Sequence, residues 1–166
     1  GHNGHGVTDH TQGNWNGIAG RIELRATEPV WIERVDLHPA MDERTLTVRA
    51  KLGRLAGAEA VETAEVVFAG RVTRGTVTWT GADGAAEIVV RPDPTDAAAM
   101  RTWDEFDPVL HAVTVRLANG ETWKGRFGWR ALAATPNGFT LNGRPMMFRG
   151  ALECAISPLT GHPATD

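Results

Sequence analysis

The acidic side chains are the first groups in this chain whose types and spacing suit chemistry. Three acids lie within Asp104–Asp107, and Glu59, Glu62 and Glu65 recur at every third position. Two carboxyl groups a few ångströms apart can share acid and nucleophile roles, as in the retaining hydrolysis of glycosides. Pro108 and the surrounding residues favour a turn for the first group, however. The glutamates fall in a strand-like segment, where a spacing of three does not bring side chains together. We therefore predict no catalytic residue in this chain.

Other nucleophiles and metal ligands give no better pattern. Ser157 is the only serine and lacks the Gly-x-Ser-x-Gly context of a nucleophile elbow. Cys154 is the only cysteine, which excludes an internal disulfide and a cysteine-based zinc site. His2, His5 and His10 are spaced for neither a helix face nor a strand face. No phosphate loop or dinucleotide fingerprint is present, so we predict no metal and no cofactor.

A polar, aromatic segment near the N-terminus is the best candidate for direct contact with a sugar. Trp15 would stack on a pyranose face while Asn14 and Asn16 bond hydroxyl groups. The alternative, which we prefer, is that Trp15 packs between two domains. Both interpretations place the segment in a loop, since Gly1–Asn16 has no hydrophobic periodicity.

Composition excludes several classes of protein. Apolar residues make up 42% of the 166 residues, which is enough for a globular core and too many for disorder. The net charge of −3 and the scattered arginines give no reason to expect a nucleic-acid partner. No apolar run approaches the 18 residues of a membrane span, and no signal peptide is visible. The compartment stays unknown.

Alternating apolar and polar residues predict strands at the spacing of a β-sandwich. A half-buried strand is expected over Ile18–Ala26, and Gly75 is expected to form a bulge. With no long helical pattern, the fold class is all-β, an immunoglobulin-like β-sandwich of about seven strands with flanking partial segments. The seven strands are expected at Val30–Leu37, Arg44–Leu52, Ala60–Ala69, Val72–Thr80, Ala85–Val90, Val109–Leu117 and Glu121–Trp129.

A hairpin is predicted after the sandwich. Asn142-Gly143 separates the apolar segments Phe139–Leu141 and Arg144–Arg149, and Asn-Gly is the strongest short signal for a two-residue turn. Residues Ala151–Asp166 show no further strand or helix pattern. A hairpin strand that leads to nothing suggests that the chain is part of a larger protein.

Several motifs together resemble glycoside hydrolase family 2, the β-galactosidase and β-glucuronidase-like enzymes. Trp103–Leu117, with its Asp-Pro-x-Leu and following strand, resembles the late part of the family's immunoglobulin-like domain. Gly128–Arg130 is similar to its Gly-aromatic-Arg motif, and Phe139–Gly150 to the segment that leads into its (β/α)8 barrel. On the N-terminal side, Trp15–Ile18 and Pro29–Val35 resemble the exit from its sugar-binding jelly roll.

The resemblance implies three domains: the end of a jelly roll at 1–28, the sandwich at 29–131, and the truncated start of a catalytic barrel at 132–166. The family's two catalytic glutamates lie on later barrel strands, so none is carried over here. Glu153 would face substrate at the first barrel strand, although Ala151–Cys154 departs from the family's Asn and His there. His111 stands where the family commonly has Tyr.

We therefore expect a non-catalytic sandwich that positions the catalytic barrel of a glycoside hydrolase. Its partners would be carbohydrate, through the parent enzyme, and the adjoining jelly roll and barrel, with neither nucleic acid nor membrane. The alternative is an independent carbohydrate-binding or adhesion module. A small stand-alone hydrolase would require convergent carboxylates, which the sequence does not reveal. The sugar and linkage cleaved by the parent stay open.

Overall fold

The structure is a computed structural model that describes residues 22–150. Every strand lies within Thr27–Met147, which form one compact unit, and the described residues contain no helix. The strand predicted at Ile18–Ala26 is wrong over residues 22–26, which have no regular structure. Ile22 and Leu24 are 74% and 102% exposed. In the described part of the chain no neighbouring strand pairs with this alternating segment, and a strand is stable only when its backbone groups are paired.

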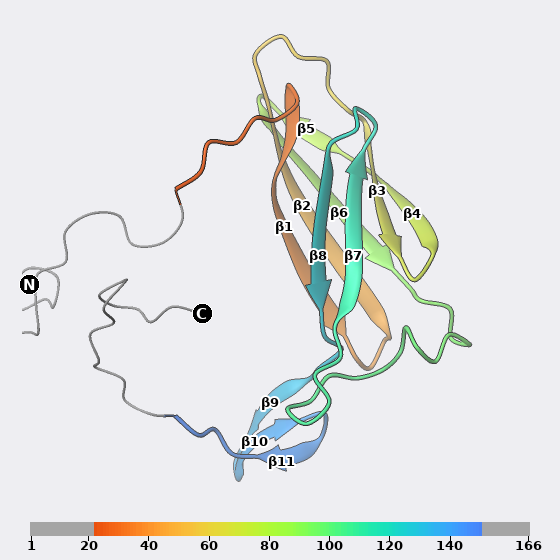
Figure 1. The fold of residues 1–166 in the computed structure, drawn as a ribbon, viewed down its shortest axis with the longest axis vertical. Coiled ribbons are helices and arrows are strands. Elements are labelled where there is room, and N and C mark those ends of the chain that lie inside the picture. Colours follow the sequence, from red (N-terminus) through yellow and green to blue (C-terminus); the bar gives the residue numbers. More distant parts are fainter. Residues whose placement is uncertain (1–21, 151–166) are drawn as a thin grey trace, which may run out of the picture. The chain divides into compact units, whose positions relative to one another are not determined.

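Two four-stranded antiparallel sheets form the sandwich (Figure 1). The first has the order β1-β2-β6-β5 and the second the order β4-β3-β7-β8. The strands of the first sheet are β1 (Val30–Ala40), β2 (Thr45–Arg54), β5 (Thr78–Thr80) and β6 (Asp83–Val90). Those of the second are β3 (Thr63–Phe68), β4 (Arg71–Thr76), β7 (His111–Leu117) and β8 (Thr122–Phe127).

The strand order is that of an immunoglobulin-like sandwich, so the predicted fold class is confirmed. In immunoglobulin labels the first sheet reads A-B-E-D and the second C′-C-F-G. Each strand begins within three residues of a predicted start except β5, which forms from the end of the segment Val72–Thr80. That segment divides, which raises the number of sandwich strands from seven to eight.

The division of Val72–Thr80 is a tertiary effect. The chain leaves the second sheet after Thr76 and joins the first sheet at Thr78. Val77 is buried between them and donates its N–H to the Glu62 carbonyl at 2.8 Å. Gly75 is not a bulge, because it pairs in regular register with Ala64. A Cβ on Gly75 would collide with the Ile88 side chain from the other sheet, so glycine allows the two sheets to approach there.

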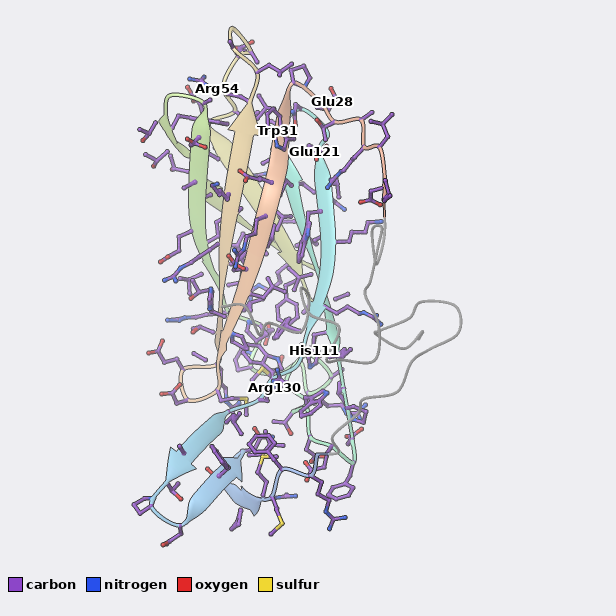
Figure 2. All side chains as sticks on the ribbon, turned by 90° about the vertical axis from the view of Figure 1, so that its left-hand side faces the viewer. Glu28, Trp31, Arg54, His111, Glu121 and Arg130 are labelled. Carbon is purple, nitrogen blue, oxygen red and sulfur yellow. The ribbon has the colours of Figure 1, made fainter. Side chains whose placement is uncertain are left out.

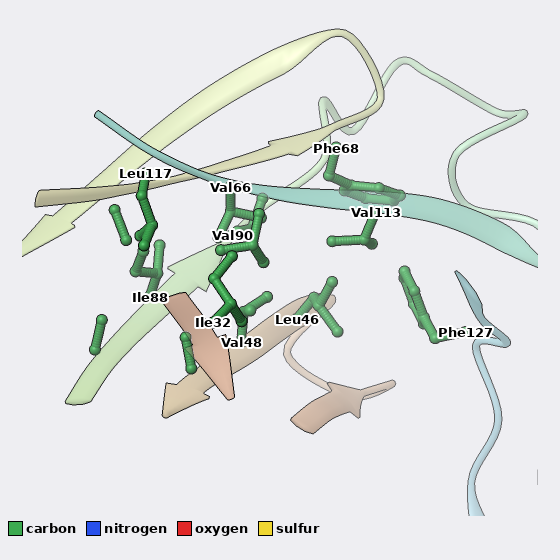
Figure 3. Packing of buried hydrophobic residues seen from close by; sticks show 14 of the residues in the cluster. Ile32, Leu46, Val48, Val66, Phe68, Ile88, Val90, Val113, Leu117 and Phe127 are labelled. Atoms are coloured by element: carbon green, nitrogen blue, oxygen red, sulfur yellow. The ribbon is translucent and has the colours of Figure 1, made fainter. Parts of the chain in front are cut away.

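The bulge lies instead in β1, where the register with β2 shifts between Ile32 and Arg34. The extra residue keeps Val30 and Ile32 and then Val35 and Leu37 turned toward the interior. The core between the sheets is built from alternate residues of every long strand (Figure 3). Its largest fully buried side chains are Trp129, Leu46, Leu52, Val48, Val66, Val90, Val113 and Val115.

A third, three-stranded sheet follows the sandwich, with β10 between β9 and β11. These strands are β9 (Leu132–Thr135), β10 (Gly138–Leu141) and β11 (Arg144–Met146). The predicted hairpin is present, and its turn residues Asn142 and Gly143 have φ of 51° and 79°. The sequence did not indicate β9, and β11 ends three residues before the predicted Arg149. The assignment of 132–166 to a separate domain stays a prediction.

Candidate functional site

The four residues predicted to contact sugar lie outside residues 22–150. They are Asn14, Trp15, Asn16 and Glu153. Ser157, Cys154 and the three N-terminal histidines also fall outside the described residues. All of these stay predictions, and the site below is built from other residues.

The acidic segment Asp104–Asp107 forms the predicted turn. Asp104 Oδ1 accepts the backbone N–H groups of Asp107 and Phe106 at 2.8 and 2.9 Å. These two hydrogen bonds, the one from Asp107 first, hold the pKa of the Asp104 carboxyl below its usual range. The Asp107 carboxylate contacts Arg101 Nη2 at 2.9 Å. A general acid at neutral pH needs a raised pKa, so Asp104 is organised as a turn residue rather than as an acid catalyst.

The three glutamates that recur at every third position also do not form a cluster. Glu59 and Glu62 precede β3, which begins at Thr63 rather than at the predicted Ala60. Glu65 lies within β3 and pairs with Arg74 of β4 at 2.7 Å. Across residues 22–150, no three or more His, Cys, Asp or Glu side chains group in a way that could hold a metal ion.

The structure brings three sequence motifs together at the end of the sandwich where the third sheet begins. Trp103 donates its N–H to the Trp129 carbonyl at 2.8 Å and forms an isolated bridge with Pro108. Gly128 lies directly beneath Trp103, since a Cβ on Gly128 would be 2.6 Å from the Trp103 Cβ. The Arg130 guanidinium lies 5.0 Å from the centre of the Trp103 ring on a cation–π contact.

Trp129 anchors these motifs in the core. It is 2% exposed, and its Nε1 donates to the Ala99 carbonyl at 2.8 Å. Its ring meets Phe127 edge to face at 4.9 Å. His111, on the adjacent strand, is buried beside the same rings, and its Nε2 lies 2.8 Å from the Arg101 carbonyl. Because a carbonyl can only accept, Nε2 carries the proton.

Asn142 connects the hairpin turn to this cluster through three hydrogen bonds. Its backbone N–H donates to the Ala131 carbonyl at 2.8 Å, and its Oδ1 accepts the Ala131 N–H at 2.9 Å. Its Nδ2 donates to the Trp103 carbonyl at 2.9 Å. One side chain therefore joins the hairpin turn, the end of the sandwich and the Trp103 loop. We call the set Trp103, Gly128, Trp129, Arg130 and Asn142 the junction.

A cleft of about 400 Å³ opens on one side of the junction. The Phe106 ring at its rim is 89% exposed. The cleft has one wall from the Trp103 loop and one from the hairpin, so any group seated in it would touch both. Its lining residues are Met41, Thr102, Asp104, Glu105, Phe106, Leu141, Asn142, Arg144, Pro145 and Met146.

Comparison with known proteins adds no information about this site. No protein-family model matches the sequence, and no match to a curated protein was found. Within residues 22–150, no helix is long and apolar enough to cross a membrane.

Sequence reasoning missed the outward contacts of Asn142. The Asn-Gly pair was correctly predicted as a hairpin turn, because both residues tolerate positive φ. The bond to Trp103 crosses 39 positions of sequence, which no local pattern reveals. The only available signal was the choice of Asn, since its amide can donate and accept at once while Asp or Gly cannot.

Proposed function

We propose that this chain is the non-catalytic β-sandwich of a glycoside hydrolase resembling family 2, and that it positions a catalytic barrel. The junction would transmit the orientation of the sandwich to the hairpin that precedes the barrel. The barrel would supply the two catalytic carboxyl groups and bind the carbohydrate.

The convergence of the junction motifs supports this proposal. Three separate motifs suggested the family: Trp103–Leu117, Gly128–Arg130 and Phe139–Gly150. Members of all three are within hydrogen-bonding or van der Waals contact at the junction. Residues that only completed a solitary sandwich would have no need to hold a hairpin beyond its last strand.

The departure at His111 is compatible with the same role. A tyrosine at this position would offer one ring and one hydroxyl donor. His111 also offers a ring, which packs against Phe127 at 5.5 Å, and an Nε2 donor to the Arg101 carbonyl. The substitution therefore keeps one buried aromatic contact and one hydrogen bond to the loop.

A hydrolysis assay on the purified chain tests the non-catalytic assignment. We expect no release of nitrophenol from nitrophenyl β-galactoside, β-glucuronide or β-mannoside. Turnover that disappears in Asp104→Asn or Glu105→Gln would contradict the proposal, because those changes remove carboxylates without altering side-chain size.

The gene offers a second test. We expect it to encode, on the C-terminal side of this sandwich, roughly 250 residues of alternating strands and helices with two strand-end glutamates. In that whole enzyme, Asn142→Ala should lower the temperature of inactivation while leaving the catalytic glutamates untouched. A neighbouring region of another fold class would contradict the proposed role.

The alternative function is an independent carbohydrate-binding or adhesion module. One observation favours it: a second cleft, beside Trp103, combines an aromatic wall with two arginines. Binding at that cleft requires no catalytic barrel, so it is treated separately below.

A further inference from the structure

The two outer faces of the sandwich carry charge in different ways. On β1 and β2, three outward basic side chains contact an acid: Arg34 with Asp36 at 2.8 Å, Arg49 with Glu87 at 2.7 Å, and Lys51 with Glu33 at 3.2 Å. These pairs balance the charge of that face, which is ordinary for a solvated sheet.

The opposite face has an excess of basic groups. Glu65 is the acid among its outward strand positions, and its carboxylate is taken by Arg74 at 2.7 Å. Arg116 of β7 and Lys124 and Arg126 of β8 have no carboxylate within ion-pair distance in the described part of the chain. Local positive charge on a chain of net charge −3 marks a surface suited to an anionic partner.

This basic row leads into a cleft of about 340 Å³ at the junction end of β8. Arg126 and Arg130 both line the cleft, and no acid does. Arg130 holds its guanidinium over the Trp103 ring, and Figure 2 shows it at this end of the sandwich. The remaining walls are apolar, and Leu110 is 49% exposed at the rim. The lining residues are Leu37, Pro39, Trp103, Leu110, Arg126, Phe127, Gly128 and Arg130.

From these features we infer that the cleft and the adjoining row bind an anionic glycan. Guanidinium groups recognise carboxylate or sulfate through paired N–H donors, and the apolar faces of a sugar ring suit an aromatic and aliphatic wall. The volume lies at the small end of the range for small-molecule sites, which fits one sugar ring. Lys124 and Arg116 would contact anionic groups on the following sugars.

Other anionic partners fit less well. Duplex DNA is read by elements that enter a groove, whereas this surface is the flat face of a sheet. Single strands are held by stacking successive bases on a series of exposed rings, and beyond the cleft the outward positions of β7 and β8 carry no aromatic side chain. An acidic peptide that added as a strand next to the basic row would use the edge of β8, and β1 lies beside that edge (Figure 1).

Calorimetric titration of the full chain at low salt tests the inference. The probes are a galacturonic acid trisaccharide, its uncharged galactose counterpart, dextran sulfate and a short DNA duplex. We expect the acidic trisaccharide to bind, and its affinity to fall as salt is raised. The uncharged counterpart should bind at least about tenfold more weakly, because charge-assisted hydrogen bonds are lost.

Two double variants with the same change in net charge distinguish binding at the cleft from attraction to the overall charge of the protein. Arg126→Gln with Arg130→Gln should weaken binding by about tenfold or more. Arg49→Gln with Lys51→Gln, on the balanced face, should change it less than about twofold. Thermal unfolding of both variants establishes that each is folded.

Each outcome of these titrations either supports or overturns the proposed binding site. Binding of dextran sulfate alone, lost in the cleft variant, would support the site and assign sulfate as its anion. Equal losses in the two variants would overturn the proposal. Equal binding of the uncharged sugar, equal binding of DNA, or no binding of either acidic glycan would also overturn it. The ligand titrations do not test the positioning role, because that role is measured by the hairpin bond from Asn142 to Trp103, which neither arginine of the cleft makes. Arg126→Gln alone, which leaves the junction intact, should also weaken binding.

Discussion

Each end of the sandwich places an arginine over a tryptophan, but the two ends connect to different things. At one end, Arg54 lies 4.9 Å from the centre of the Trp79 ring and donates twice to the Gly81 carbonyl. Those contacts close a turn within a single sheet. At the other end, Arg130 lies 5.0 Å from the Trp103 ring, where the neighbouring bonds reach a hairpin outside the sandwich. Figure 2 shows Arg54 and Arg130 at the two ends.

The difference shows that one structural device can serve two purposes. Both ends use glycine to let an indole lie against the backbone: Gly53 beneath Trp31 at one end and Gly128 beneath Trp103 at the other. At the Arg54 end this packing lies within the β1–β2 pair. At the junction the same packing positions the Trp103 loop, whose carbonyl then accepts a bond from Asn142. Perturbing the two ends in parallel should therefore separate folding from coupling.

The largest effect is expected from Trp129→Ala. Truncating a fully buried tryptophan should cost about 3–5 kcal/mol, because it leaves a cavity and deprives the Ala99 carbonyl of its donor. Trp79→Ala at the other end should cost less, since Trp79 is only partly buried. Urea unfolding followed by far-ultraviolet circular dichroism measures both. A smaller loss for Trp129→Ala than for Trp79→Ala would show that the junction is not part of the core.

Gly128→Ala and Gly53→Ala come next. In each, the new methyl group would lie within 3 Å of an indole, and overpacking of this kind costs about 1–3 kcal/mol. Both should lower the midpoint of urea unfolding. Only Gly128→Ala should also reduce hydrogen-exchange protection in β10 and β11 beyond the global loss. If Gly53→Ala has the same local effect, the two ends are not functionally distinct.

Asn142→Ala should release the hairpin while leaving the sandwich folded. Loss of two side-chain hydrogen bonds at a turn should cost about 1–2 kcal/mol, and the loss should be local. Hydrogen exchange should quicken over residues 138–146 and stay unchanged in β2 and β6. Asn142→Asp is the matched control, since it keeps the acceptor for Ala131 and loses the donor to Trp103. A smaller loss for Asp than for Ala would assign the smaller part to the Trp103 bond and the remainder to the Ala131 bond and to the strain of alanine at a φ of 51°.

Lowering the pH should produce the smallest effect on stability. We expect that effect at the junction end of the sandwich. The folded-state pKa of Asp104 is lowered, so its contribution to stability is present above the unfolded pKa of about 3.9 and is lost as pH falls through the folded value. Exchange protection of the Phe106 and Asp107 amides should therefore fall as the pH drops below about 4. Asp104→Asn should remove this pH dependence. A dependence that persists in the variant would assign it to another group.

The prediction of the fold succeeded where burial follows local alternation. In β7, His111, Val113, Val115 and Leu117 point inward, as their spacing of two requires. It failed where two sheets compete for one segment. The run Val72–Thr80 reads as one strand-like segment of β-branched residues, yet Val77 is the point at which the chain passes from one sheet to the other. Local alternation carries no information about which sheet a strand will join.

The site was harder to predict for a related reason. The Asn-Gly turn and the acidic turn could both be read from neighbouring residues, because turn chemistry is local. The junction depends on contacts between residues 103, 128 and 142, and the basic row on which side chains lack an acid across the strands. Such relations exist only once strand pairing and register are known.

The sequence alone determined an all-β sandwich, most of its strands, its hairpin turn and the turn role of Asp104–Asp107. Each follows from short-range rules of alternation and backbone conformation. The tertiary structure decided that a segment changes sheets at Val77, that Asn142 joins the hairpin to the Trp103 loop, and that one face has unpaired basic groups. Those features depend on distances between residues far apart in the chain, and only packing sets them.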